Sequence, residues 1–243
     1  MIKDITKFNN LGLIFFFILL YLSLITGFYF NEDSNGGAFL DYKGQKDVSK
    51  AFAIDFKHTF LNYDNFATRH SPILIIFLSF FEKINLHDNL IRLIHLHISL
   101  ILPFIFYLIL IEKFKYIEKK YILLITGIIF LSPTFRSLSI WPDSRLLGLS
   151  IFSLSVLFYL YFLRFNQFKY CFLNILFCAL SSYISPNFSV FSIYFLYFFI
   201  KKYKFFGKEL FYIIISNILL SIPALYYLFV LDINFLTKTA VIS

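Results

Sequence analysis

Charge is scarce in this sequence. Only 15% of the 243 residues are charged and 59% are hydrophobic, with a mean hydropathy of +0.77. A soluble domain carries roughly 25% charged residues, so this composition excludes a soluble catalytic domain and indicates a polytopic membrane protein. At about 20 apolar residues per crossing, a chain of this length has room for roughly six to eight spans.

Cysteine is scarcer still. The two cysteines, Cys171 and Cys178, are seven positions apart inside an apolar run, a placement that indicates neither a disulfide nor a metal site. His95 and His97 are not at metal-ligand spacing on one helix face, and no cysteine or carboxylate companion is close in sequence. The sequence therefore predicts no metal site and no cofactor, and leaves a divalent metal requirement open.

Apolar runs separated by basic residues define the expected spans. No small-residue cleavage site follows the first run, residues 11–30, so we expect a retained membrane helix and not a signal peptide. The remaining expected spans are residues 89–111, 121–133, 146–163, 170–184, 188–200 and 210–230. Together they predict an all-α bundle of about seven transmembrane helices in a single membrane domain, residues 1–243.

Residues 31–88, the outer segment, form the one long polar stretch and carry eight of the fourteen acidic residues. Within it, Val48, Phe52, Phe56 and Phe60 recur at every fourth position, while the residues between them are largely polar. This period is typical of an amphipathic helix, which we expect to lie on the membrane surface.

A second helix is expected near the end of the outer segment. Ser71 is a helix-capping residue type and Pro72 suits the first helical position, so together they predict a helix start before the apolar run 73–81. That run is too short to span a bilayer easily. We therefore expect an interfacial or re-entrant helix.

The basic residues assign the two sides of the membrane. If residues 73–81 do not cross, one side holds twelve of the 22 lysines and arginines, in the N-terminal tail and in the loops 112–120, 164–169 and 201–209. The short loops on the other side hold only Arg136 and Arg145. The positive-inside rule then places the outer segment and Asp143 on the same outer face. It also explains the net charge of +8 without a nucleic-acid partner.

Carboxylates at the expected outer face are the candidates for chemistry. Asp41 lies shortly after the first span, where a carboxylate meets both water and a lipid-borne substrate and can act as a general base on a hydroxyl. A solvated loop aspartate is the alternative interpretation, and Asp33 is the alternative base. Asp143 follows Trp141 and Pro142 at an expected helix start, where a capping role competes with a catalytic one.

Four basic side chains are candidate phosphate ligands. Arg69 and His70 precede a helix start whose free N–H groups attract anions. Arg136 and Arg145 flank Asp143, and arginine suits bidentate binding of phosphate. Structural roles stay open for each of them: a structural histidine, an interfacial arginine, or an ion pair with Asp143.

These motifs resemble a known family. The acidic outer segment leads to RHSPIL at 69–74, NLIRL at 89–93 begins a span, and Ser-Pro at 132–133 leads through an arginine to an aspartate. This arrangement is similar to the GT-C membrane glycosyltransferases, particularly the protein O-mannosyltransferase and aminoarabinose-transferase branch, and covers nearly the whole chain. The family continues beyond its seventh span, so the chain is expected to be a C-terminally truncated member.

The sequence also departs from the family pattern. The usual Asp-Glu pair is Asp41-Tyr42 here, or Glu32-Asp33 in reversed order, which leaves Asp41 and Asp33 as competing bases. Ser71 replaces the first proline of a Pro-Pro pair.

The resemblance implies sugar transfer from a polyprenyl-phosphate-linked donor to an acceptor on the outer face of a bacterial inner (plasma) membrane, for the cell envelope. Asp41 would deprotonate or orient the acceptor, and Asp143 would orient an arginine or the sugar. The departing lipid phosphate would be stabilised by Arg69, His70, Arg136 and Arg145. The expected partners are the lipid-linked donor and membrane lipid. Two other classes stay open: a transporter or flippase of a lipid-linked or anionic substrate, and a non-catalytic membrane subunit.

Overall fold

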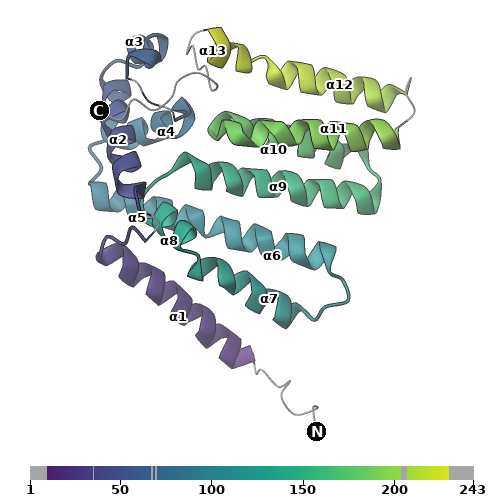
Figure 1. Cartoon of the computed structure of the whole chain (residues 1–243), viewed down its shortest axis with the longest axis horizontal. Helices are drawn as coiled ribbons and strands as arrows, with labels where there is room; N and C mark the ends of the chain where they lie inside the picture. The colour runs from purple at the N-terminus through teal and green to yellow at the C-terminus, as the bar shows by residue number, and fades with distance from the viewer. Residues whose placement is uncertain (1–9, 35, 67, 69, 204–206, 230–243) are drawn as a thin grey trace.

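A computed structural model describes residues 10–34, 36–66, 68, 70–203 and 207–229, with the side chains of residues 10 and 228 excepted. Every regular element in these ranges is a helix, which confirms the all-α prediction for this part of the chain. In Figure 1 most of the helices run roughly side by side, and α2, α3, α4 and α13 gather at one end of them.

Among the described residues, four stretches are helical and apolar enough to cross a membrane: Leu11–Tyr29, Asp88–Lys113, Ser144–Phe165 and Lys208–Tyr227. They comprise α1 (Asn10–Tyr29), α5 (Asp88–Ser99) with α6 (Ile101–Lys113), α9 (Ser144–Phe165), and α12 (Lys208–Ser221) with part of α13 (Ala224–Phe229). These helices are the signature of an integral, multi-pass membrane protein.

The other expected spans are shorter or broken. The helix α7 (Lys119–Gly127) continues into the 3-10 turn η2 (Ile128–Leu131), and a bend of 66° separates them from α8 (Pro133–Ile140). Counted as one broken span, they bring the total to five by length and composition, so seven spans are not shown. Two apolar helices fall short: α10 (Phe168–Ile184) has 17 residues, and α11 (Phe191–Lys202) has 12 and follows the 3-10 turn η3 (Pro186–Val190).

The span Asp88–Lys113 is interrupted earlier than its proline. The break between α5 and α6 falls at Leu100, three residues before Pro103. The physical reason is that proline has no N–H to bond the carbonyl four residues before it, here that of Ser99. The lost hydrogen bond therefore lies one turn before the proline.

The expected amphipathic helix of the outer segment is two helices. The first, α2 (Ala38–Ile54), ends at Asp55, whose backbone is extended with φ −140° and ψ 94°. The Asp55 carboxylate accepts a hydrogen bond of 2.9 Å from the backbone N–H of His58 and so caps α3 (Phe56–Leu61). The prediction of one continuous helix is wrong because this aspartate starts a new helix in the middle of the apolar stripe.

The apolar stripe also serves a different purpose from the one expected. Val48 and Phe52 are buried and pack against Tyr63 of the turn η1 (Tyr63–Phe66) and Ile75 of α4 (Pro72–Lys83). Their apolar face therefore covers protein and not membrane. Only the α3 part of the stripe is open, with Phe56 51% exposed.

The helix α4 begins as predicted. The Ser71 hydroxyl accepts a hydrogen bond from the Ile73 N–H, and Pro72 is the first helical residue. With 12 residues α4 does not meet the length for a span, and it packs along α2 at the same end of the molecule. By length and composition α4 is therefore not among the candidate membrane spans.

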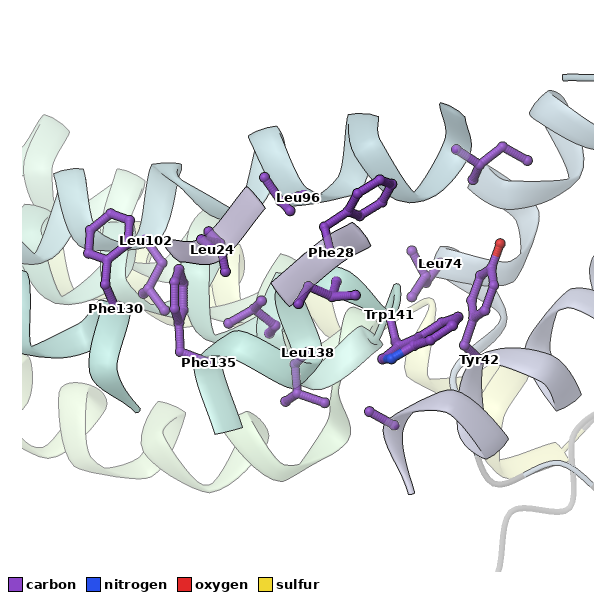
Figure 2. Packing of buried hydrophobic residues seen from close by; sticks show 14 of the residues in the cluster. Leu24, Phe28, Tyr42, Leu74, Leu96, Leu102, Phe130, Phe135, Leu138 and Trp141 are labelled. Atoms are coloured by element: carbon purple, nitrogen blue, oxygen red, sulfur yellow. The ribbon is translucent and has the colours of Figure 1, made fainter. Parts of the chain in front are cut away.

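A hydrophobic core joins this end to the long helices. Figure 2 shows Leu24 and Phe28 of α1 beside Leu96 of α5, with Trp141 next to Tyr42 of α2. The rings of Tyr42 and Trp141 are 5.9 Å apart between centroids. Because both residues are buried, this contact fixes α2 against the segment that leads to Asp143.

Candidate functional site

Arg145 connects the outer segment to the residues at the start of α9. It lies in the first turn of α9, and its Nη2 donates hydrogen bonds of 2.7 Å to Asp41 Oδ2 and of 2.7 Å to Asp143 Oδ2. Its Nε donates a third, of 2.9 Å, to Asp143 Oδ1. Asp41, His70, Asp143 and Arg145 are hereafter the Arg145 cluster.

Asp143 is the structural anchor of this cluster. It is fully buried, and its Oδ1 also accepts the backbone N–H of Arg145 at 2.7 Å, which caps α9. The carboxylate that caps α9 thus also holds the Arg145 guanidinium. Because the guanidinium is held in a bidentate fork, Asp143 sets the direction in which Arg145 points.

Asp41 is the accessible carboxylate. It lies in the first turn of α2, and its side chain is 40% exposed. One oxygen contacts Arg145, and the other is 4.0 Å from His70 Nε2. A carboxylate with one face toward a cation and part of its surface open can receive a proton from a bound hydroxyl.

His70 borders the cluster as a neutral side chain. Burial lowers the His70 pKa below its usual value, and the nearby Asp143 and Asp41 oppose this shift only in part. The imidazole is therefore uncharged at pH 7 and acts through hydrogen bonds, not as a cation. The Tyr63 hydroxyl fixes the backbone here by donating to the His70 carbonyl at 2.8 Å.

Ser71 ties the cluster to the C-terminal helices. Its hydroxyl donates to the carbonyl of Tyr183 at the end of α10, and it lies 2.9 Å from the hydroxyl of Tyr227 in α13. Tyr227 itself donates to the Tyr183 carbonyl at 2.8 Å. The start of α4, and with it His70, is thereby held against the far half of the chain.

Arg136 does not contact the cluster. It forms a bidentate pair with Glu32, with bonds of 2.7 and 2.5 Å, and it also donates to Ser23 and Phe130. Trp141 Nε1 donates to the Glu32 carbonyl at 3.1 Å. The neighbouring guanidinium lowers the pKa of Glu32, despite its partial burial. Arg136 thus closes the end of α1 against α8.

Asp33, the alternative base, is a helix cap. Its two carboxylate oxygens accept three backbone N–H bonds at the start of α2, from Gly37 at 3.1 Å and from Ala38 and Phe39 at 3.2 Å. Gly37 has a φ of 98°, a conformation that favours glycine. Between the two competing aspartates, only Asp41 contacts Arg145. Arg69, the remaining candidate, lies outside the described residues.

An apolar groove extends from Arg145. It has a volume of about 670 Å³ and runs between α6, α8, α9 and η3. Its apolar wall includes Leu102, Phe106, Leu149, Phe152 and Val156. Because α9 lines it from Arg145 to Val156, the groove follows about 16 Å of helix at 1.5 Å per residue. It is suited to a hydrocarbon chain whose polar end meets Arg145.

The sequence did not predict that Arg92 packs against the ring of Trp141. The guanidinium of Arg92, in α5, lies 3.6 Å from the Trp141 ring centroid and 5.0 Å from that of Phe28. Arg92 Nε also donates to the Ile140 carbonyl at 3.3 Å. The sequence signal for this contact was Arg92 itself. An arginine near the start of an apolar span is energetically costly unless it has a partner.

A second polar network was also missed. Asp88 accepts hydrogen bonds from the Tyr42 hydroxyl at 2.6 Å and from Lys46 at 2.5 Å, and Lys46 is 3.9 Å from Glu82. Burial and the hydrogen bond to Asp88 raise the pKa of Tyr42, so its hydroxyl stays a donor. This network clamps α2 to the start of α5.

Metal-ligating side chains do not form a group of three or more among the described residues. Both oxygens of Asp143 are engaged by Arg145. No protein-family model matches the chain, and comparison with curated proteins and with solved structures gives no match.

Proposed function

We propose that the protein is a membrane glycosyltransferase that takes a sugar from a polyprenyl-phosphate-linked donor. One observation carries the proposal: Arg145 belongs both to the carboxylate cluster and to the wall of the apolar groove. A phosphate at the head of a lipid chain needs this combination, because the chain requires an apolar channel and the phosphate requires a cation with several donors.

Electrostatics define the order of events in this proposal. Asp41 and Asp143 carry two negative charges against the single positive charge of Arg145, so an incoming phosphate competes with carboxylates for the guanidinium. Asp143 is buried and bidentate, whereas Asp41 is 40% exposed and makes one bond to Arg145. The phosphate therefore displaces Asp41 and frees it for the acceptor.

The freed Asp41 then acts as the base. It takes the proton of the acceptor hydroxyl, and the hydroxyl oxygen forms a bond to the anomeric carbon of the sugar. The bond between that carbon and the phosphate oxygen breaks, and the lipid phosphate keeps the electron pair. Arg145 stabilises the developing negative charge, and neutral His70 supplies a hydrogen bond at the same place.

The proposal includes a membrane topology. In it α7 with η2, α10 and α11 also cross, which makes seven spans, and the Arg145 cluster faces the exterior or periplasmic side of a bacterial inner membrane. The support is the concentration of lysines in the turns at the other end, including Lys113, Lys119 and Lys201. Cysteines introduced near Asp41 and Asp143 should both be labelled from outside.

A binding and transfer experiment tests this function. Purified protein in nanodiscs is offered polyprenyl phosphate or the matching polyprenol, and binding is measured by native mass spectrometry. We expect the phosphate to bind at least tenfold more tightly, and Arg145→Gln to remove that preference. Arg164→Gln is the matched control, because Arg164 is also on α9 but pairs with Glu112 at the other end.

Transfer is measured with polyprenyl-phosphate-linked sugars labelled in the sugar. Label should move to an acceptor in wild-type protein and not in Arg145→Gln. Equal binding of phosphate and polyprenol would refute the site, whereas selective binding with movement of the donor across the bilayer and no transfer would instead establish a lipid-phosphate transporter.

A further inference from the structure

A second cavity lies between α10, α11 and α12. It has a volume of about 160 Å³ and shares no lining residue with the apolar groove. Because one water molecule needs only about 10–15 Å³ of such space, the cavity has room for a small molecule of several heavy atoms. Polar side chains from three helices line it: Asn174, Ser182, Ser192, Asn217 and Ser221.

Of the polar side chains that line the cavity, Tyr183 joins two helices, because its hydroxyl donates to the Leu220 carbonyl of α12. The serines and Asn217 bond instead to nearby carbonyls of their own segments. Ser182 donates to the Cys178 carbonyl at 2.7 Å, and Asn217 donates to the Ile213 carbonyl at 2.9 Å, each within its own helix. Ser221 likewise donates to the Ile218 carbonyl at 2.7 Å. Polar residues between membrane helices usually bond across the interface. Here the serine hydroxyls and one N–H of Asn217 donate within the helices, and the side-chain oxygens remain able to accept hydrogen bonds.

Asn174 strengthens the case for a ligand. It is fully buried, and its Nδ2 donates to the Ser155 carbonyl at 2.9 Å and the Ser155 hydroxyl at 2.8 Å. Its Oδ1 has no hydrogen-bond partner among the described residues. The opposite orientation of the amide would place its oxygen against the Ser155 carbonyl, so the assignment is secure. A buried acceptor without a partner is costly and calls for a donor.

The lining determines the class of ligand. No acidic or basic side chain stands among the described residues that line the cavity, so a charged ligand would be buried without a counter-charge. Acceptor oxygens call for hydroxyl donors, while Phe195 and Phe199 provide apolar surface for carbon atoms. We propose that this cavity binds a small uncharged polyol of glycerol size, either free in solution or as the headgroup of a neutral lipid.

Photolabelling in nanodiscs tests the proposal. The probe is a monoacylglycerol that carries a diazirine near its headgroup, at a low mole fraction in phosphatidylcholine, and labelled peptides are identified by mass spectrometry. We expect labelling of α10, α11 and α12. The dimethyl ether of the same probe, which has no O–H donors, should label roughly tenfold less. Equal labelling by the two probes would overturn the proposal without the need for any variant.

Two variants locate the site. Ala179→Leu fills the cavity and Asn174→Leu removes its unpaired acceptor, so both should lose the labelling. Leu180→Phe is the control, because Leu180 is adjacent to Ala179 but 41% exposed and does not line the cavity. Helix content by circular dichroism establishes that each variant is folded. A folded Ala179→Leu protein that labels like wild type would show that the cavity is not the site.

The source of the polyol is distinguished by competition. Free glycerol that suppresses the labelling indicates a water-borne ligand, and labelling that resists glycerol indicates a lipid headgroup. Absence of labelling by the monoacylglycerol, together with no saturable binding of radiolabelled glycerol, would refute both sources.

Discussion

Arg145 Nη2 lies 2.7 Å from Asp41 Oδ2, a contact between residues 104 positions apart in the sequence. It brings the first turn of α2 against the first turn of α9, at the polar end of the apolar groove. Since Asp143 holds the same guanidinium from the buried side, Asp41 is the partner that a ligand can displace.

Replacement of Asp41 tests its role as the base. Asp41→Asn keeps the shape and an oxygen for Arg145 but removes the proton acceptor, so sugar transfer should fall by about 10²–10⁴-fold. Binding of polyprenyl phosphate should persist or tighten, because a neutral amide competes less for Arg145. Asp47→Asn is the matched control on the same helix, because Asp47 pairs with Lys50 of α2 and not with Arg145. Wild-type transfer by Asp41→Asn would exclude this assignment.

Replacement of Asp143 separates capping from orientation. Asp143→Ala removes the α9 cap and the bidentate partner of Arg145, and should lower the free energy of unfolding by about 2–3 kcal/mol. Asp143→Asn retains a cap but loses the charge, so its loss should be smaller. Both should weaken the binding of polyprenyl phosphate. Unfolding in detergent micelles measures the loss of stability. Equal stability of Asp143→Ala and Asp143→Asn would contradict the capping role.

Substitution of Gly27 tests the ion pair between Glu32 and Arg136. A Cβ at position 27 would collide with Glu32 Oε2 and come within 2.9 Å of Arg136 Nη2. Gly27→Ala should therefore break the pair and lower stability by about 1–3 kcal/mol. Combined with Glu32→Gln, the loss should be smaller than the sum of the two single losses. Additive losses, measured by thermal unfolding of the double mutant, would show that the collision is relieved elsewhere.

His70 predicts a pH dependence of stability. Because burial lowers the pKa of His70 in the folded protein, the unfolded chain binds the proton more readily. Neutral His70 contributes fully to the free energy of unfolding at pH values above the unfolded pKa of about 6.5. That contribution is lost as pH falls toward the lower pKa of the folded protein. The melting temperature should thus decrease between pH 7.5 and 5.5, and by less in His70→Asn. Identical slopes for the two proteins would assign the pH dependence to other groups.

Local patterns predicted the parts of this fold that depend on neighbouring residues. Ser71 and Pro72 start α4 as expected because a cap acts within one turn. Asp143 caps α9 for the same reason. The break at Asp55 was missed because the four-residue period of the apolar stripe continues across it.

The candidate site was predictable only in part. Its polar residues stand out in an apolar chain, so Asp41, Asp143 and Arg145 were all named from the sequence. An ion pair between an arginine and Asp143 was one of the alternatives left open. The other contacts were not predicted, because Arg136 and Arg145 look alike in sequence, yet one pairs with Glu32 and the other with Asp41. The sequence left Asp33 as the alternative to Asp41, and only the structure shows that Asp33 accepts three backbone N–H bonds at the start of α2.

The sequence by itself determined that this is a helical membrane protein, because hydropathy and helix caps are local properties of the chain. Only the tertiary structure decided which carboxylate faces which arginine, that Arg145 adjoins an apolar groove, and that α10, α11 and α12 enclose a polar cavity. The physical reason is that pairing and packing depend on distances between residues far apart in the chain, which composition and periodicity do not encode.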